Sequence, residues 1–292
     1  MLKNYLNLMK LRITFLVIVT CYLGYYLGIR HENPQQYMVE IDTIIPFLNL
    51  VLGTFLTSSG AAILNQYRER HLDKLMDRTK NRPLPTNAIK PFNALALGIV
   101  FSVFGVFYLF LKLNFLTALI AALTIISYVL IYTPLKTKTK WNTIVGAFPG
   151  ALPPVGGWTA ATGVIEVPAI LLFLILFFWQ MPHFLSLAII YKDDYSKGGF
   201  KMFPSVSDNL DSTYFQIIFF TLALIISTIS LFFIKKAGIV YLIGAGLLGV
   251  IFLIYSSNIL FDKSDDKIRK LFIFSIIYLP LLMLLIIMDP QI

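Results

Sequence analysis

Long apolar segments alternate with short polar ones along the whole chain. They lie at about residues 13–29, 45–64, 92–111, 115–132, 143–161, 168–190, 214–234, 239–260 and 271–288. As a helix, each could cross the ~30 Å hydrocarbon core of a bilayer. The pattern therefore predicts an all-α polytopic membrane protein with nine transmembrane helices around a central cavity. Prolines and glycines interrupt the fifth segment, and such breaks are tolerated where a helix lines a cavity.

The basic residues are distributed unequally between the two sides of this nine-span arrangement. One side receives 20 of the 24 Lys and Arg residues, and the other keeps only Arg30, Lys112, Lys235 and Lys236. Because cytoplasmic loops are enriched in Lys and Arg, we expect a cytoplasmic N-terminus and an external C-terminus in the cell inner (cytoplasmic) membrane. The net charge of +9 then reflects a bilayer partner rather than nucleic acid.

Composition supports a membrane protein without internal disulfides. The chain is 58% hydrophobic and 13% charged, which excludes an ordinary soluble globule. Its single cysteine, Cys21, lies in the first apolar segment, so an intrachain disulfide is excluded. We expect one membrane domain over residues 1–292, built from two four-helix repeats at about 8–135 and 141–260 plus a ninth helix.

An acidic motif begins where the second apolar segment ends. Asn65, Glu69, Asp73 and Asp77 recur every fourth residue, so on a helix they would form one slowly drifting stripe of oxygen-bearing side chains. Arginine and lysine residues interleave with them. Oxygen ligands suit a hard divalent cation and guanidinium groups suit phosphate, so the motif predicts a site for a lipid-like substrate with a diphosphate head.

A second polar cluster follows the sixth apolar segment and is expected on the same face. It contains Asp193 and Asp194, which would face the first motif across the cavity, because one metal ion cannot reach all four side chains of a stripe that rises ~18 Å. Mg²⁺ bridging carboxylates and substrate phosphates is the expected arrangement. His183 lies nearby inside an apolar segment, where a histidine indicates either a functional site or an internally bonded structural residue.

These motifs resemble the signatures of the UbiA superfamily of intramembrane prenyltransferases, over roughly residues 8–290. The resemblance rests on the spacing from Asn65 to Asp77 with its continuation to Leu84, and on the segments 149–158, 179–184 and 192–204. Within the superfamily, the chain most specifically resembles the branch that farnesylates protohaem IX. The family usually has Asp at the position of Glu69, and Lys-Pro-Arg where this chain has Lys10-Leu11-Arg12.

The resemblance implies a Mg²⁺-dependent transfer of farnesyl from farnesyl diphosphate to haem B, with haem A synthase as a partner. It also implies roles for individual residues. The expected metal ligands are Asn65, Glu69 and Asp193. The expected catalytic carboxylates are Asp73, Asp77 and Asp194. Haem is expected at His183. Diphosphate is expected at Lys10, Arg12, Arg78, Lys136 and Lys192.

Other interpretations remain open on the sequence alone. A secondary transporter would explain the helices and the basic rim, although transporters tend to place ionisable groups near the bilayer midplane. A non-catalytic assembly factor for a respiratory oxidase would need no Mg²⁺. A quinone-precursor prenyltransferase would differ only in its acceptor. The Pro153-Pro154 and Gly156-Gly157 pairs either kink a helix or make room for a bulky ligand.

Overall fold

The computed structural model describes residues 1–32, 40–206 and 209–289, and within these ranges every regular element is a helix. This confirms the all-α prediction. The α-helices are α1 (Leu2–Met9), α2 (Leu11–Glu32), α3 (Ile41–Asp73), α4 (Pro91–Lys112), α5 (Phe115–Ile126), α6 (Thr133–Leu135), α7 (Asn142–Ala151), α8 (Pro153–Thr162), α9 (Val167–Ile190), α10 (Lys192–Lys197), α11 (Asp211–Phe233), α12 (Ile239–Phe261) and α13 (Asp265–Met288). A π-helical segment (Ser127–Tyr132) joins α5 to α6, and a 3-10 turn spans Phe203–Ser205.

In the described part of the chain, eight helices are long and apolar enough to cross a membrane. They correspond to eight of the nine apolar segments. The remaining segment forms two ten-residue helices, α7 and α8, that meet at Leu152. Pro153 opens α8, where its missing N–H costs nothing. The exact count of nine crossings therefore stays a prediction.

Large apolar side chains cover the outside of the bundle. Phe104, Phe107 and Ile226, for example, are all more than half exposed. Inside, one continuous cluster of buried apolar side chains joins α7 and α8 to α9, α11, α12 and α13. Because soluble proteins rarely expose large contiguous apolar surfaces, this arrangement fits an outer surface that faces lipid.

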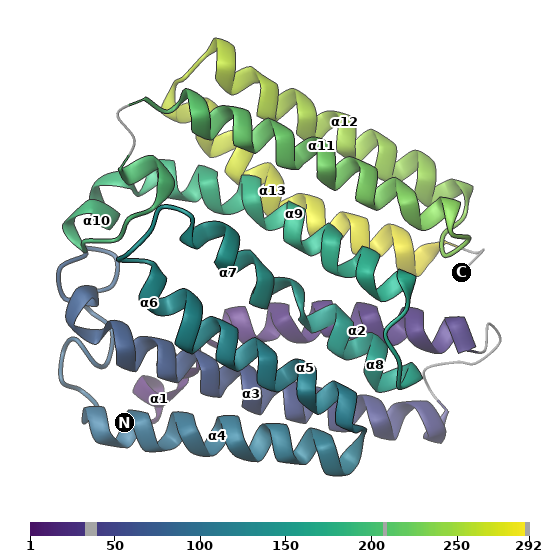
Figure 1. Ribbon diagram of the computed structural model, residues 1–292, viewed down its shortest axis with the longest axis horizontal. Coiled ribbons are helices and arrows are strands. Elements are labelled where there is room, and N and C mark those ends of the chain that lie inside the picture. Colours follow the sequence, from purple (N-terminus) through teal and green to yellow (C-terminus); the bar gives the residue numbers. More distant parts are fainter. Residues whose placement is uncertain (33–39, 207–208, 290–292) are drawn as a thin grey trace.

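The polar segments gather at one end of the bundle. In Figure 1, α1, the loop after α3, α6 and α10 all lie at this end, whereas α13 finishes at the opposite end. The alternation of the apolar segments predicts the same grouping. Which end faces the cytoplasm stays a prediction.

The glycine-rich break in the fifth apolar segment is used for close packing against α2. A Cβ added at Gly157 would lie 1.8 Å from the carbonyl oxygen of Cys21, and one at Gly24 would lie 1.9 Å from that of Pro154. Small residues let two membrane helices approach until their backbones touch. At Gly157, helix packing therefore explains the small residue, and the alternative of room for a ligand is not needed.

Candidate active site

Three of the predicted acidic-motif residues line the last turns of α3. Asn65, Glu69 and Asp73 are only 1%, 5% and 0% exposed, which confirms the helical stripe for these three. The prediction was wrong for the fourth residue, because α3 ends at Asp73 and Asp77 lies exposed in the loop that follows. Thr79 turns the chain there by donating a hydrogen bond to the carbonyl oxygen of Asp73 (2.9 Å), which satisfies one of the unpaired carbonyls at the helix end.

Each residue of the buried stripe contacts a different base. Lys10 Nζ donates to Asn65 Oδ1 (3.2 Å). Lys136 Nζ donates to Glu69 Oε1 (2.7 Å), and Arg82 Nη1 lies 2.9 Å from both carboxylate oxygens of Asp73. These bases come from the α1–α2 junction, the end of α6 and the loop after α3. Since buried charge is costly unless it is paired, the tertiary fold makes this stripe possible.

A π-helical turn aims two further groups at α3. Thr133 Oγ1 donates to the carbonyl of Tyr128, five residues earlier (2.8 Å), as the wider turn requires. Asn65 Nδ2 in turn donates to Thr133 Oγ1 (3.0 Å), which leaves Asn65 Oδ1 directed at Lys10. The widened turn also sets the direction of Lys136, whose ammonium lies 4.7 Å from the ring centre of Tyr132. Such π-bulges occur frequently at functional sites.

Two of these bases, Lys10 and Lys136, lie outside the membrane-spanning segments and have shifted pKa values. Burial, assisted by the charge of Arg82, lowers the pKa of Lys10 to about 7, although Glu69 acts in the opposite direction. Burial is the largest single influence on Lys136 and acts to lower its pKa, but Glu69, Tyr132 and Tyr128 together outweigh it and raise this pKa above its ordinary value. Lys136 therefore stays charged at neutral pH.

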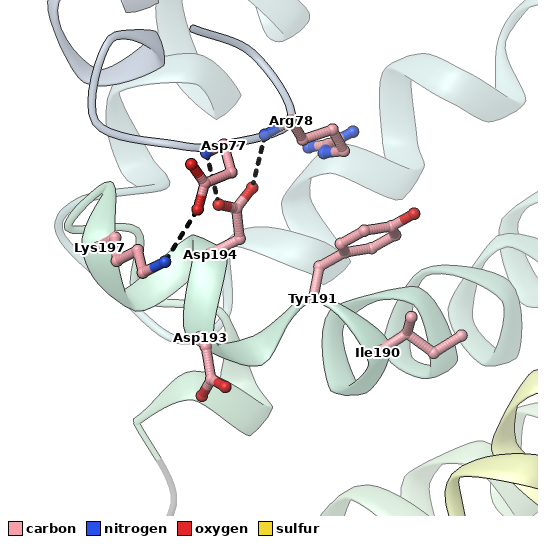
Figure 2. Close-up of a pocket in the computed structure, with 7 residues that line it drawn as sticks. All are labelled: Asp77, Arg78, Ile190, Tyr191, Asp193, Asp194 and Lys197. Atoms are coloured by element: carbon pink, nitrogen blue, oxygen red, sulfur yellow. Dashed lines mark hydrogen bonds and ion pairs between the residues drawn. The ribbon is translucent and has the colours of Figure 1, made fainter.

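The second acidic cluster meets the loop that follows α3. Asp194 on α10 accepts hydrogen bonds from the backbone N–H groups of Asp77 (2.7 Å) and Arg78 (3.3 Å), as Figure 2 shows. Asp77 itself pairs with Lys80 (2.6 Å) and Lys197 (2.9 Å), and hydrogen bonds from these two lysines lower its pKa to about 2. Residues 117 positions apart in sequence are thus brought together.

The same loop and α10 line a pocket of about 430 Å³ that is open to the surface. Its lining residues are Asp77, Arg78, Ile190, Tyr191, Asp193, Asp194 and Lys197. Arg78 lies over the ring of Tyr191, 5.4 Å from its centre, and donates a hydrogen bond to the hydroxyl of Tyr195 (3.4 Å). Its guanidinium is thereby held at the pocket, where it could meet a phosphate group.

Three predicted residues are less closely connected to the site. Asp193 points away from Asp194 and the Asp77 loop in Figure 2, so its role as a metal ligand beside Asn65 and Glu69 stays a prediction. Arg12 is exposed in the first turn of α2, and Lys192 is half-buried at the start of α10. Within the residues that the structure describes, neither base forms an ion pair.

Sequence reasoning missed several members of this network, namely Arg82, Lys197, Thr133 and Tyr195. Arg82 and Lys197 both lie within the recognised motifs, but nothing in the sequence pairs them with particular acids. Those pairs depend on how the loop folds back over the end of α3. Thr133 had no signal in the spacing, because its contact to Asn65 depends on the π-helical turn.

The donor set fits a magnesium ion shared with a substrate. In the described residues, no three His, Cys, Asp or Glu side chains lie close enough to hold a metal by themselves. Mg²⁺ usually takes one or two carboxylates and completes its shell with water and substrate phosphates. The buried amide and carboxylate oxygens of Asn65 and Glu69 are donors of this hard type.

His183 lies on α9, about two turns before Tyr191. Its Nδ1 is 2.8 Å from the hydroxyl of Ser275 on α13, and its ring stacks against Trp179 and Phe272. The neighbouring Gln180 instead faces α7, where its amide nitrogen donates to the carbonyl of Ala147 (3.2 Å). In the sequence motif around His183, His183 therefore contacts α13 and Gln180 contacts α7.

Comparison with known proteins places this arrangement in a family. The profile of the UbiA prenyltransferase family matches residues 17–279. The chain belongs to the UbiA prenyltransferase family. Among curated relatives of this UbiA member, the protoheme IX farnesyltransferase of Solibacter usitatus is 40% identical over 289 residues, covering 99% of each chain. The protoheme IX farnesyltransferase of Myxococcus xanthus is 38% identical over 278 residues, covering 95% of this chain and 91% of its own.

Solved structures share the UbiA fold at low sequence identity. A digeranylgeranylglyceryl phosphate synthase has a TM-score of 0.81 at 18% identity, covering 99% of this chain and 98% of its own. A UbiA homologue from Archaeoglobus fulgidus, solved with DMAPP and Mg²⁺, has a TM-score of 0.67 at 17% identity, covering 98% and 99%. These two likenesses show the helical fold alone.

Proposed function

We propose that this protein transfers the farnesyl group of farnesyl diphosphate to a vinyl group of protohaem IX (haem B), giving haem O. The proposal rests above all on full-length identity of 40% to a protoheme IX farnesyltransferase. It is supported by the polar network at the end of α3, where Lys10, Arg82 and Lys136 converge on three buried oxygen-bearing side chains.

The proposed diphosphate site is the basic rim around that network. Lys10, Arg12, Arg78, Lys136 and Lys192 would neutralise the diphosphate oxygens. Asn65, Glu69 and Asp193 would hold Mg²⁺, which supplies further positive charge to the departing diphosphate. Support comes from the Archaeoglobus fulgidus homologues, which were solved with Mg²⁺ and either DMAPP or GPP. In this chain, Lys136 and Glu69 are already in contact, so a phosphate oxygen entering the site would compete for the lysine.

The bases would assist the reaction by stabilising negative charge as it develops on the leaving group. Heterolysis of the farnesyl C–O bond releases diphosphate and leaves an allylic cation. The apolar helices would shield this cation from water until the haem vinyl carbon attacks it. Water then adds to the resulting haem carbocation and loses a proton, which leaves a hydroxyethylfarnesyl side chain.

The remaining acids have proposed supporting roles. Asp73, bound by Arg82, would set the electrostatic balance beside Glu69. Asp194, through the backbone of Asp77 and Arg78, would hold the α3 loop closed over the diphosphate. His183 would contact the haem acceptor. The enzyme would lie in the cytoplasmic membrane with this end facing the cytoplasm, and haem A synthase would receive its product.

The proposal is tested with purified protein in detergent, Mg²⁺, farnesyl diphosphate and ferrous haem B, with products read by mass spectrometry. We expect farnesylated haem from wild type, and none without Mg²⁺ or from Asn65→Ala and Asp193→Ala. Asp266→Ala is the matched control, because Asp266 is an exposed acid on α13 that pairs only with Lys270 in the described contacts. Prenylation of hydroxybenzoate or dihydroxynaphthoate instead of haem would move the protein to the quinone-precursor branch. Binding of farnesyl diphosphate with no acceptor prenylated would favour a carrier or an assembly factor.

A further inference from the structure

The ring of His183 is held from three directions. Its centroid lies 5.0 Å from that of Trp179 and 5.0 Å from that of Phe272, with interplanar angles of 15° and 23°. Nδ1 contacts Ser275 Oγ at 2.8 Å. Trp179 Nε1 also donates to the carbonyl oxygen of Ser275 (2.7 Å), so two consecutive turns of α9 are attached to the same residue of α13. The imidazole therefore has a defined orientation.

The hydrogen bonds of Ser275 determine which nitrogen of His183 carries the proton. Ser275 is fully buried, and its single hydroxyl proton is donated to the carbonyl of Phe272 at 2.6 Å. Were that proton directed at His183 instead, two acceptor oxygens would lie 2.6 Å apart with no hydrogen between them. This arrangement favours Ser275 Oγ as the acceptor from His183, so the proton of a neutral His183 imidazole is expected on Nδ1.

The other ring nitrogen is left with its lone pair. Among the residues that the structure describes, none forms a hydrogen bond with His183 Nε2. Histidines that bind metals usually donate their second ring N–H to a fixed acceptor, which sets both the tautomer and the ring orientation. His183 and Ser275 have this arrangement, although no three acids, cysteines or histidines gather around them in the described chain.

We infer that His183 Nε2 binds the iron of the haem acceptor, and that Ser275 is the positioning residue that keeps this lone pair available. This inference rests on the proposed function for the identity of the acceptor. A contact to a haem propionate is disfavoured, because the Nε2 lone pair would face a carboxylate with no proton between them. Binding by one neutral imidazole suits a haem that must arrive and leave as substrate.

The tautomer is measured without haem or activity. The chain has only three histidines, so ¹⁵N-histidine labelling in detergent gives three ring systems, and His183→Gln identifies the one of interest. We expect a proton on Nδ1 in wild type and a shift toward the Nε2-protonated form in Ser275→Ala. Ser227→Ala is the matched control, since Ser227 is a buried serine bonded only to its own helix carbonyl among the described contacts. A wild-type proton on Nε2 would overturn the inference.

Ligand binding is measured by titrating the same proteins with haem B and, separately, with iron-free protoporphyrin IX. We expect Ser275→Ala to bind haem B about 10-fold more weakly, in line with losses at other outer-shell partners of metal ligands. We expect His183→Ala to lose the nitrogen-ligand signature in the haem spectrum. Iron-free porphyrin should bind the wild type and every variant equally, which also shows that the variants are folded. Unchanged haem affinity and spectrum in His183→Ala would contradict the inference.

These outcomes separate from those of the transfer assay. Haem binding that depends on His183, without any farnesyl transfer, would support the iron contact and contradict the proposed reaction. Farnesyl transfer by a protein whose haem spectrum does not depend on His183 would do the reverse. If His183→Ala lost the same affinity for iron-free porphyrin as for haem B, His183 would recognise the porphyrin periphery. This result would overturn the iron contact.

Discussion

At the scale of single residues, the end of α3 combines burial with charge. Asp73 is completely buried, and its carboxylate accepts both of its side-chain hydrogen bonds from Arg82, which is 25% exposed. Asp77 lies only four residues later, in an exposed loop, and pairs with Lys80 and Lys197. Removing one partner of a buried pair leaves an uncompensated charge, whereas exposed pairs are screened by water. The two acids should therefore respond very differently to loss of their partners.

We predict that Arg82→Ala lowers the free energy of unfolding by about 3 kcal/mol, at the low end for a broken buried pair because Arg82 is partly exposed. Denaturant unfolding in detergent micelles measures this loss. Lys80→Ala, in the same loop, is the control and should change stability far less. Adding Asp73→Asn to Arg82→Ala should restore part of the loss, because no buried charge then remains. Equal effects of Arg82→Ala and Lys80→Ala would contradict the prediction.

At the scale of elements, two irregular helices set the geometry of the bundle. The π-helical turn before α6 directs Thr133 and Lys136 toward α3. The break between α7 and α8 lets α8 cross α2 at backbone contact, through Gly157 and Gly24. In a membrane, close packing of this kind takes over much of the role that the hydrophobic effect has in water.

We predict that Gly157→Ala destabilises the protein by about 1–3 kcal/mol, because a Cβ placed 1.8 Å from the Cys21 carbonyl oxygen must push α2 and α8 apart. Gly246→Ala on α12 is the matched control. No atom lies within 4 Å of its added Cβ, so the better helix propensity of alanine should leave stability unchanged or slightly raised. Thermal unfolding in detergent measures both variants, and a tolerated Gly157→Ala would show that the crossing is looser than the structure indicates.

At the scale of the whole molecule, polar chemistry is concentrated at one end of the bundle. The basic loops, both acidic clusters and the open pocket lie at that end. Lys138 lies exposed after α6 at this end, and Lys235 lies exposed between α11 and α12 at the other. From the positive-inside rule we predict that the polar end faces the cytoplasm.

We predict that Lys138→Cys reacts with a membrane-impermeant maleimide only after the cells are permeabilised, whereas Lys235→Cys reacts in intact cells. The only native cysteine, Cys21, is buried, and Cys21→Ala removes its background in both variants. Quantitative labelling of each variant before and after permeabilisation provides the measurement. The reverse pattern would invert the proposed topology and place the diphosphate site outside the cell.

Much of the fold could be predicted from periodicity alone, because long apolar runs have few alternatives in a bilayer. Seven of the predicted segments are single long helices. An eighth, Phe115–Leu135, consists of α5, the π-helical segment and α6 in unbroken succession. The stripe from Asn65 to Asp73 followed from the 3.6-residue repeat. Asp77 escaped this reasoning, because a four-residue spacing does not reveal where a helix ends.

Local properties of the chain, namely apolar length, charge asymmetry and spacing along one helix, were determined by the sequence itself. They depend on neighbours within a few turns and on the bilayer as solvent. Only the tertiary structure decided which base meets which acid, that Asp194 holds the loop backbone rather than facing the stripe, and that Ser275 orients His183. Such pairings join segments up to 120 residues apart and depend on distances of a few ångströms, which no spacing in one segment encodes.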